Sequence, residues 1–307
     1  MGAARGERRG RGAAAPPGIR ARAFHAAGVL AREAADIAFW PFLETALTLY
    51  RESSDERGIA DVLHALSYRD LAAGDYARAI TLLEEALARR RALGDLRGIA
   101  ETLGGLSSAY GLQNEDRRAI ALLEEAVAIR RRLGDTWGLT VALATLGMTL
   151  AGIGALDQAE HLLTEAFPLQ ESLNNRAGAA LSLFGLAMVA RKRGEIAAAR
   201  AFCRQAITAW QETGNMIQIG TALLEMASIS LLDGRAAIAA QFLGFVSAHL
   251  QRLQFAVPPR YQRVYETAVA DTRRLLADAE FDAAYQIGSR LSLDDVLALV
   301  LTQDSLP

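Results

Sequence analysis

Few residues in this sequence have the type and spacing that catalysis or metal binding would require. None of its four histidines has a histidine or cysteine partner four positions away, so their spacing predicts no metal site. These histidines are His25, His64, His161 and His249. The sequence also contains no Gly-x-Ser-x-Gly nucleophile turn and no glycine pattern for binding a dinucleotide. We therefore expect a protein without enzymatic activity and without a cofactor.

The basic residues do not predict binding of phosphate or nucleic acid. The only lysine, Lys192, lies in the sequence RKRGE, which excludes a GxxxxGK[ST] phosphate loop. Arginine runs at 89–91 and 130–132 come just before Gly94 and Gly134, where cations complement a helix dipole. Neighbouring glutamates offset these runs, and no interleaved aromatic residues are present to stack on bases. With a formal net charge of -2, the chain is not expected to bind nucleic acid.

The strongest pattern in the sequence is a repeat with a period of 40 residues. The segment LLEEA at 82–86 recurs at 122–126, and Gly94-Asp95 recurs as Gly134-Asp135. This register defines six repeats, at residues 16–55, 56–95, 96–135, 136–175, 176–215 and 216–255. Self-similarity at such a period predicts a stacked repeat architecture.

The two ends of the chain lie outside the repeats. Residues 1–15 are rich in glycine, arginine and alanine, so we expect a disordered tail. Whether this tail contacts nucleic acid or only solvent stays open at this stage. Residues 256–307 are expected to form a helical cap, because terminal caps keep repeat arrays soluble.

Each repeat contains the pattern of two helices. In the first helix, leucines spaced three apart, such as Leu63 and Leu66, form one apolar stripe. A turn follows at Gly74 and its equivalents, and a second helix carries small residues at Ala79 and its equivalents. The sequence therefore predicts an all-α, right-handed solenoid of six helix-turn-helix repeats with C-terminal capping helices.

The repeat register also decides two ambiguous features, the single cysteine and one long apolar segment, and leaves a third open. Cys203 occupies a position that carries leucine in other repeats, so we expect a buried core thiol. As the only cysteine it forms no internal disulfide, which fits a cytoplasmic location. The segment 136–156 carries no charge and is long enough to span a bilayer, but it aligns with the first helix of the other repeats, so no membrane span is expected. The irregular sequence Phe39-Trp40-Pro41-Phe42 is either an end cap or a docking surface.

The repeats resemble the tetratricopeptide family. The motif Gly74-Asp75-Tyr76 at the turn, followed by alanine and leucine at fixed offsets, carries this resemblance. The family period is about 34 residues, and the longer unit here is similar to the repeats of bacterial signal-transduction ATPases and of LuxR-type, maltose-activator-like regulators. The segment LSLDD at 291–295, with Pro258-Pro259, resembles the C-terminal tail of those regulators. Neither their ATPase domain nor their helix-turn-helix domain is found in this sequence.

The resemblance implies that the first helix of each repeat lines a concave groove. The groove positions we single out are His64, Tyr68, Ser108, Met148, Phe184, Met188 and Arg191. Asp61 and Glu101 lie in the same rows and make one end of the groove acidic and polar. Methionine suits an adaptable partner surface, and Arg191 could bind a partner carboxylate. The alternative, that Met148, Phe184 and Met188 only pack between repeats, stays open.

The function predicted from the sequence is non-catalytic. We expect a scaffold that binds a peptide or protein segment in its groove, as the sensor or adaptor part of a bacterial regulatory system. The resemblance suggests a separate ATPase or DNA-binding regulator chain as the partner. The alternative is a small-molecule effector-binding domain of a transcriptional regulator. A deep pocket with convergent polar groups would favour the alternative, and an open groove would favour a peptide partner.

Overall fold

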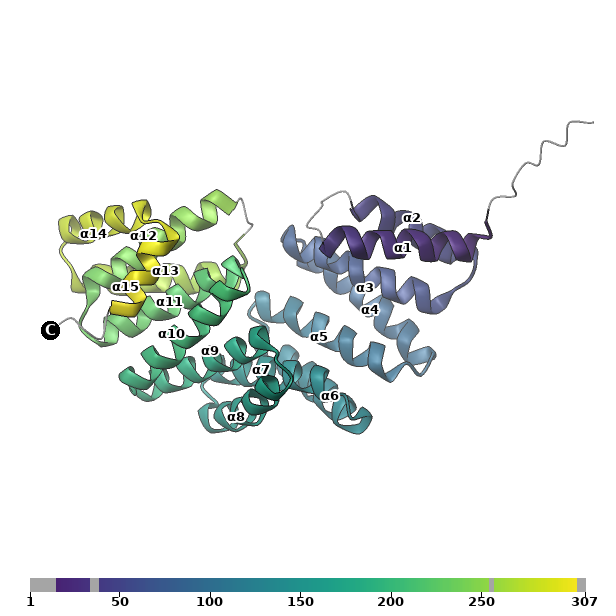
Figure 1. Ribbon diagram of the computed structural model, residues 1–307, viewed down its shortest axis with the longest axis horizontal. Coiled ribbons are helices and arrows are strands. Elements are labelled where there is room, and N and C mark those ends of the chain that lie inside the picture. Colours follow the sequence, from purple (N-terminus) through teal and green to yellow (C-terminus); the bar gives the residue numbers. More distant parts are fainter. Residues whose placement is uncertain (1–14, 34–38, 254–256, 303–307) are drawn as a thin grey trace, which may run out of the picture.

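The chain folds into consecutive pairs of antiparallel helices that curve around an open centre (Figure 1). The computed structural model describes residues 15–33, 39–253 and 257–302, so the expected tail at 1–15, except for its last residue, lies outside the described residues. Fifteen helices occupy the described part of the chain. They are α1 (Pro17–Glu33), α2 (Phe39–Glu52), α3 (Glu56–Ala72), α4 (Tyr76–Ala92), α5 (Leu96–Leu112), α6 (Asp116–Leu133), α7 (Thr136–Ile153), α8 (Leu156–Ser172), α9 (Arg176–Arg193), α10 (Ile196–Glu212), α11 (Met216–Leu232), α12 (Ala236–Leu253), α13 (Pro259–Leu275), α14 (Asp278–Arg290) and α15 (Leu293–Thr302). The all-helical solenoid predicted from the sequence is confirmed.

The short connections between helices follow from the recurring polar and glycine residues. The side chain of Asp55 accepts a hydrogen bond from the backbone N–H of Gly58 and so caps α3. Asp95, Asp135, Asn175 and Asn215 cap α5, α7, α9 and α11 in the same way. The preceding residue has a positive φ in each case, such as +66° at Gly94. A left-handed residue ends one helix and a polar cap begins the next, which allows pairs to stack closely.

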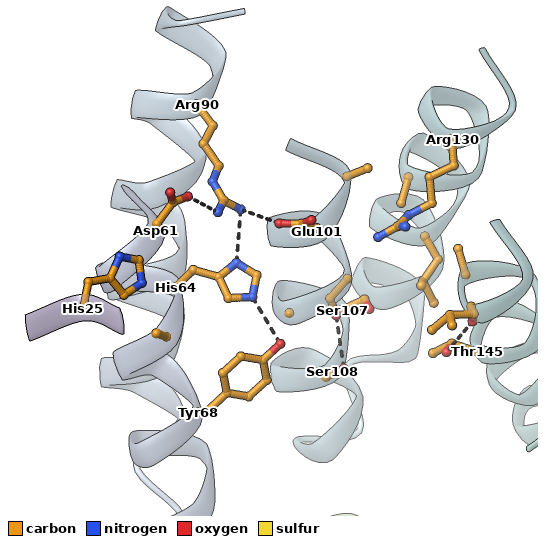
Figure 2. A pocket seen from close by; sticks show the side chains of 18 residues that line it. His25, Asp61, His64, Tyr68, Arg90, Glu101, Ser107, Ser108, Arg130 and Thr145 are labelled. Atoms are coloured by element: carbon orange, nitrogen blue, oxygen red, sulfur yellow. Dashed lines mark hydrogen bonds and ion pairs between the residues drawn. The ribbon is translucent and has the colours of Figure 1, made fainter. Parts of the chain in front are cut away.

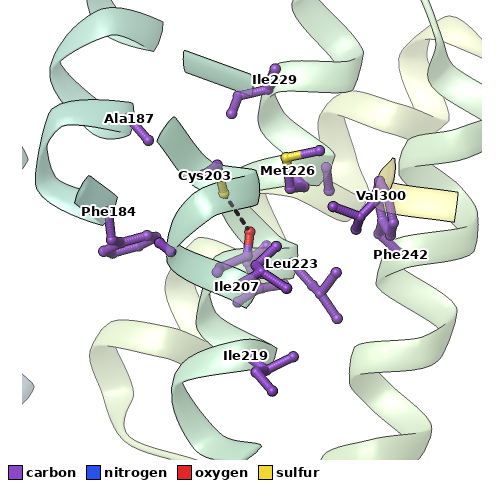
Figure 3. Close-up of a cluster of buried hydrophobic side chains, with 14 of the residues drawn as sticks. Phe184, Ala187, Cys203, Ile207, Ile219, Leu223, Met226, Ile229, Phe242 and Val300 are labelled. Carbon is purple, nitrogen blue, oxygen red and sulfur yellow. Dashed lines mark hydrogen bonds between the residues drawn. The ribbon is translucent and has the colours of Figure 1, made fainter. Parts of the chain in front are cut away.

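Each helix of the array buries several side chains, and one buried position on the second helix recurs in every repeat. We call a set of residues that occupy the same position in successive repeats a column. In one column, every side chain is at most 2% exposed; its members are Leu43, Leu83, Leu123, Leu163, Cys203 and Leu243. Cys203 belongs to this column and is fully buried, with its thiol directed at the backbone carbonyl of Ala222 (Figure 3). Burial raises the pKa of the Cys203 thiol, which keeps it protonated. The expected core thiol is therefore confirmed.

Helix α7 is an interior element of the solenoid, although its length and composition would allow it to cross a membrane. Of the helices described, only Thr136–Ile153 passes that test, and half of its apolar window is buried inside the protein. Leu143 and Ala144 at its centre are completely covered by neighbouring helices. The helix packs against α6, α8 and α9, as its register predicts.

The proline in the irregular first repeat does not break a helix. Pro41 is the third residue of α2, where its missing N–H would have no partner in the helix. Of the neighbouring aromatic residues, Phe42 is 37% exposed and packs against Phe24 of α1, with ring centroids 6.2 Å apart. This arrangement covers the first end of the array.

The C-terminal helices close the other end of the array. Helix α14 packs along α12, where the two backbones touch at Gly244 and Gly288. A Cβ atom at Gly288 would lie 1.9 Å from the carbonyl oxygen of Gln241. Helix α15 adds Val296 and Val300 to the core beside Phe242 (Figure 3).

Helix α13 does more than cap the last repeat. It packs against α11 and α12 and also reaches across the array to α5. Near its start, the guanidinium of Arg260 donates to the carbonyl oxygen of Gly111 at 3.2 Å and to the carboxylate of Asp116 at 2.5 Å. The expectation of an end cap at 256–307 is therefore incomplete, because α13 also contacts a repeat far from the end of the array. The repeat register could not predict this contact, since α13 lies outside the repeats.

Two histidines make the stability of this fold sensitive to acid. Burial lowers the pKa of His249, which stacks on Phe245, and burial also lowers the pKa of His25. The unfolded chain therefore takes up protons below about pH 6.5 before the folded chain does. We expect the free energy of unfolding to decrease as the pH falls from 7.5 to 5.5, measured by urea denaturation. His249→Phe should reduce this decrease, whereas His161→Gln at an exposed position should leave it unchanged; an unaltered pH dependence in His249→Phe would contradict the assignment.

Candidate functional site

The first helices of the repeats form one face of the array, which we call the inner face, made by α3, α5, α7, α9 and α11. A cavity of about 600 Å³ opens on this face between α3, α5 and α7 (Figure 2). We call it the inner pocket, and it is also lined by His25 of α1, Arg90 of α4 and Arg130 of α6. It is the place on the inner face where charged, aromatic and hydroxyl side chains converge.

Arg90 is the buried centre of the inner pocket. Its side chain is only 5% exposed, and its guanidinium donates to the carboxylate of Asp61 at 2.7 Å. It also donates to the carbonyl oxygen of Gly98 and to the hydroxyl of Thr102, each at 2.7 Å. The carboxylate of Glu101 lies 3.6 Å from the same guanidinium. A buried cation with this many partners fixes the position of the two acidic side chains above it.

A second set of hydrogen bonds runs from Arg90 to the aromatic wall of the pocket. The guanidinium lies 3.3 Å from Nδ1 of His64, and Nε2 of His64 lies 3.2 Å from the hydroxyl of Tyr68 (Figure 2). Because a guanidinium can only donate, Nδ1 of His64 accepts, and Nε2 carries the proton that it donates to Tyr68. Hydrogen bonds thus connect Arg90, His64 and Tyr68.

The repeat architecture brings Arg90 to this place. Arg90 belongs to a column near the end of each second helix that also holds Tyr50, Arg130, Gln170 and Trp210. In four cases a glycine stands eight residues later, and Gly58, Gly98 and Gly138 lie directly against Tyr50, Arg90 and Arg130. At Gly58 an added Cβ would lie 2.5 Å from the ring of Tyr50, so glycine provides the space for the large side chain.

Arg130 holds the equivalent position in the next repeat. One of its terminal nitrogens donates to the carboxylate of Asp135 at 3.0 Å, and its side chain is 14% exposed. Its Nε is buried and has no hydrogen-bond partner among the described residues. Figure 2 shows Arg130 across the pocket from Arg90. Its charge is largely balanced by Asp135.

Sequence comparisons identify the type of repeat. Two family models, both described as tetratricopeptide repeat, match residues 70–132 and 180–213. The chain contains tetratricopeptide repeats. Among curated proteins, none matches the sequence significantly. The resemblance to signal-transduction ATPase regulators is not supported by these matches and stays a prediction.

Solved structures support the same fold. Apo RapI aligns over 83% of this chain and 99% of its own, with 12% identity and a TM-score of 0.54. Repeats of a kinesin light chain from Podosopora anserina align over 65% of this chain and 98% of theirs, with 18% identity and a TM-score of 0.51. A tetratricopeptide-repeat protein from Parabacteroides merdae aligns over 88% of this chain and 99% of its own, with 12% identity and a TM-score of 0.51. At these identities the similarity concerns the fold alone.

Three of the seven groove residues predicted from the sequence lie together in the inner pocket. His64, Tyr68 and Ser108 all line it. They differ in accessibility: His64 is buried, Tyr68 is 44% exposed and Ser108 is exposed. The two acidic residues of the same rows, Asp61 and Glu101, also line the pocket. The structure therefore brings these polar and acidic residues together in one cavity, and their role in binding a partner stays a prediction.

The prediction that Phe184 faces a partner is wrong. Phe184 is 6% exposed and packs against Trp210 of α10, with ring centroids 5.6 Å apart. Met148 and Met188 are half-buried and pack against the same cluster of core residues. The alternative interpretation, in which these side chains pack between repeats, agrees with the structure, because Trp210 turns this part of the inner face into core.

Arg191 is also engaged within the chain. Its Nε donates to the carboxylate of Glu225 on α11 at 2.5 Å, and the side chain of Glu225 is only 9% exposed. A partner carboxylate would have to displace this buried acid. The expected role of Arg191 in binding a partner is therefore unsupported, since the neighbouring repeat supplies its anion.

The sequence alone did not reveal the role of Arg90, Arg130 and His25. The two arginines were interpreted only as part of basic runs at helix ends. Their alignment with Tyr50, Gln170 and Trp210, each at the same position of its repeat, could have identified them as buried. Among the described residues, no group of three or more histidine, cysteine and acidic side chains could hold a metal ion. The inner pocket therefore has the features of a binding site, with groups that form hydrogen bonds and ion pairs.

Proposed function

We propose that this chain is a non-catalytic scaffold that binds a peptide or protein segment on the inner face of its second to fourth repeats. Tetratricopeptide repeats generally mediate protein–protein interactions. The observation that carries the proposal is the inner pocket, where exposed polar groups are held in place by the buried Arg90. Prearranged groups at an accessible surface reduce the cost of ordering them on binding.

Among the described residues, only the part of the inner face formed by α3, α5 and α7 is open to a partner, so we expect the bound segment to be short. Helix α13 lies against α11, and its Arg260 reaches Gly111 near the end of α5 and Asp116 at the start of α6. The inner face near α11 is thus already covered by the chain itself. A bound segment would lie along α3, α5 and α7 and end near α13.

A regulatory role in the cytoplasm is part of the same proposal. The partner would be a separate chain, such as an ATPase or a DNA-binding regulator, as the resemblance of the sequence suggests. The absence of a phosphate loop from the sequence agrees with a role in binding rather than in nucleotide hydrolysis.

Site-specific photo-cross-linking tests the proposed surface. A photoreactive phenylalanine analogue at exposed Ser108 should capture a discrete partner, whereas the same analogue at exposed Glu124 of α6 should not. The captured segment, made as a peptide, should bind the purified chain. Tyr68→Ala should weaken this binding about tenfold, because loss of a central aromatic contact costs about 1–2 kcal/mol. Equal capture from Ser108 and Glu124, or unchanged affinity in Tyr68→Ala, would contradict the proposal.

A small-molecule sensor is the second candidate. The inner pocket has a volume of about 600 Å³, within the range of ligand pockets, and several polar side chains converge on it. A sensor would bind an effector with no peptide present, and the effector would raise the melting temperature. A metabolite that raises the melting temperature of the wild type but not of Tyr68→Ala would favour this candidate over the scaffold.

A further inference from the structure

The terminal nitrogens of the two pocket arginines bind groups within the protein, although the buried Nε atoms of both arginines have no hydrogen-bond partner among the described residues. Arg90 is 5% exposed and directs its guanidinium at Asp61, His64 and internal oxygen atoms. Arg130 is 14% exposed and pairs with Asp135. Neither guanidinium presents much surface to a ligand, although both lie at the pocket wall.

The serine and threonine hydroxyl groups of the pocket also direct their protons inward. Ser107 and Ser108 both donate to the carbonyl oxygen of Gly104, at 2.7 and 3.1 Å. Thr145 donates to the carbonyl oxygen of Val141 at 2.9 Å. With their protons engaged, these oxygens have only lone pairs left for a ligand. The pocket therefore offers acceptors.

The accessible charge of the pocket is negative. The side chains of Asp61 and Glu101 are 38% and 48% exposed, and each directs one oxygen at Arg90. Their other oxygens, Asp61 Oδ2 and Glu101 Oε1, have no partner among the described residues. Two carboxylates face one buried guanidinium, which leaves one negative charge at the pocket mouth. Burial lowers the pKa of His25, so the imidazole adds no positive charge near neutral pH.

An aromatic face completes the environment. The ring of Tyr68 is 44% exposed and is held by its hydrogen bond to His64. Aromatic rings attract cations through their electron-rich faces. Two fixed carboxylates, acceptor hydroxyls and an exposed ring all favour the same kind of ligand group.

From this arrangement we infer that the inner pocket recognises a basic side chain, an arginine or a lysine, of the bound partner segment. This inference rests on the proposed function and adds the chemistry of the partner to it. Asp61 and Glu101 bind the cation directly. Arg90 is a positioning residue, because it orients both carboxylates and is itself too buried to reach the ligand.

The minimal probe is N-acetyl-arginine amide, with N-acetyl-citrulline amide as its uncharged control of the same shape. In titrations of the full chain followed by NMR, the arginine probe should shift the amide signals of residues 61–68 and 101–108. The citrulline probe should bind at least about tenfold more weakly, because it lacks the charge that strengthens hydrogen bonds to a carboxylate. The affinity of the arginine probe should also fall as salt is raised from 50 to 500 mM.

Two variants test which carboxylates are responsible. Asp61→Asn with Glu101→Gln should weaken binding of the arginine probe about tenfold or more. Glu101→Gln alone, whose carboxylate is the more distant from Arg90, should weaken it less and retain the wild-type fold if the double variant unfolds. Glu124→Gln on α6 is the matched control and should bind the probe as the wild type does.

The inference is overturned if citrulline and arginine probes bind equally, or if Asp61→Asn with Glu101→Gln folds and binds the arginine probe unchanged. These outcomes leave the proposed scaffold function standing if the cross-linked peptide still binds through Tyr68. If neither the probe nor any peptide captured at Ser108 binds, the scaffold function fails as well.

Discussion

Replacement of Gly288 by alanine is expected to destabilise the protein by about 3 kcal/mol, the upper end of the usual cost of overpacking, because it forces two packed helices apart. A methyl group there would lie 1.9 Å from the carbonyl oxygen of Gln241 and 2.6 Å from its carbonyl carbon. Both atoms are backbone, so no side-chain rotation can relieve the overlap. Helix α14 would have to move away from α12, which would also disturb the cluster of Ala240, Phe281 and Ala284.

The matched control is Gly104→Ala in the middle of α5. No heavy atom lies within 4 Å of a Cβ built at this glycine. Alanine should therefore stabilise the helix by about 0.5–1 kcal/mol through its higher helix propensity. Urea denaturation of both variants measures the difference. A Gly288→Ala protein as stable as the wild type would show that α12 and α14 do not touch as described.

The second large effect is expected for Phe184→Ala. This side chain is 6% exposed and lies against Trp210 in the largest group of core residues. Truncation of a buried phenylalanine typically costs about 3–5 kcal/mol, part of it due to the cavity that remains. Met188→Ala should add a smaller loss, because Met188 is only half-buried.

Tyr68→Ala provides the contrast on the same face. The ring of Tyr68 is 44% exposed, so its removal should cost about 1 kcal/mol or less. Thermal melts of Phe184→Ala and Tyr68→Ala should therefore separate core from surface along the inner face. A small loss of stability in Phe184→Ala would restore that residue as a candidate partner contact.

Local sequence signals were sufficient for the repeated part of the fold. Leucine spacing, glycine turns and aspartate caps act over a few residues, and each recurs at the same point of the 40-residue register. The path of α13 depends instead on the ion pair between Arg260 and Asp116, which are 144 positions apart. No local pattern encodes such a contact, so the sequence could not reveal where α13 crosses the array.

The candidate site was only partly predictable from the sequence. The repeat register gives the position of a residue on its helix, but it does not identify the side chains of other helices that pack against that residue. His64 and Phe184 occupy the same position in different repeats. His64 contacts Arg90 at the pocket, whereas Phe184 contacts Trp210 in the core. Arg90 and Trp210 themselves share a column, so the residue chosen in that column decides whether the inner face is a polar pocket or a packed core.

The crossing of α13 changes how the solenoid should unfold. In an open array each repeat contacts only its neighbours, and its ends can fray one repeat at a time. Here Arg260 joins the last helices to the α5–α6 turn, which closes the segment between them into a loop. Opening any repeat inside this loop strains the others, whereas the helices from α1 to α4 lie outside it. We therefore expect the amide hydrogens of α1 to α4 to exchange faster than those of the helices from α5 to α13, which hydrogen-exchange measurements would check.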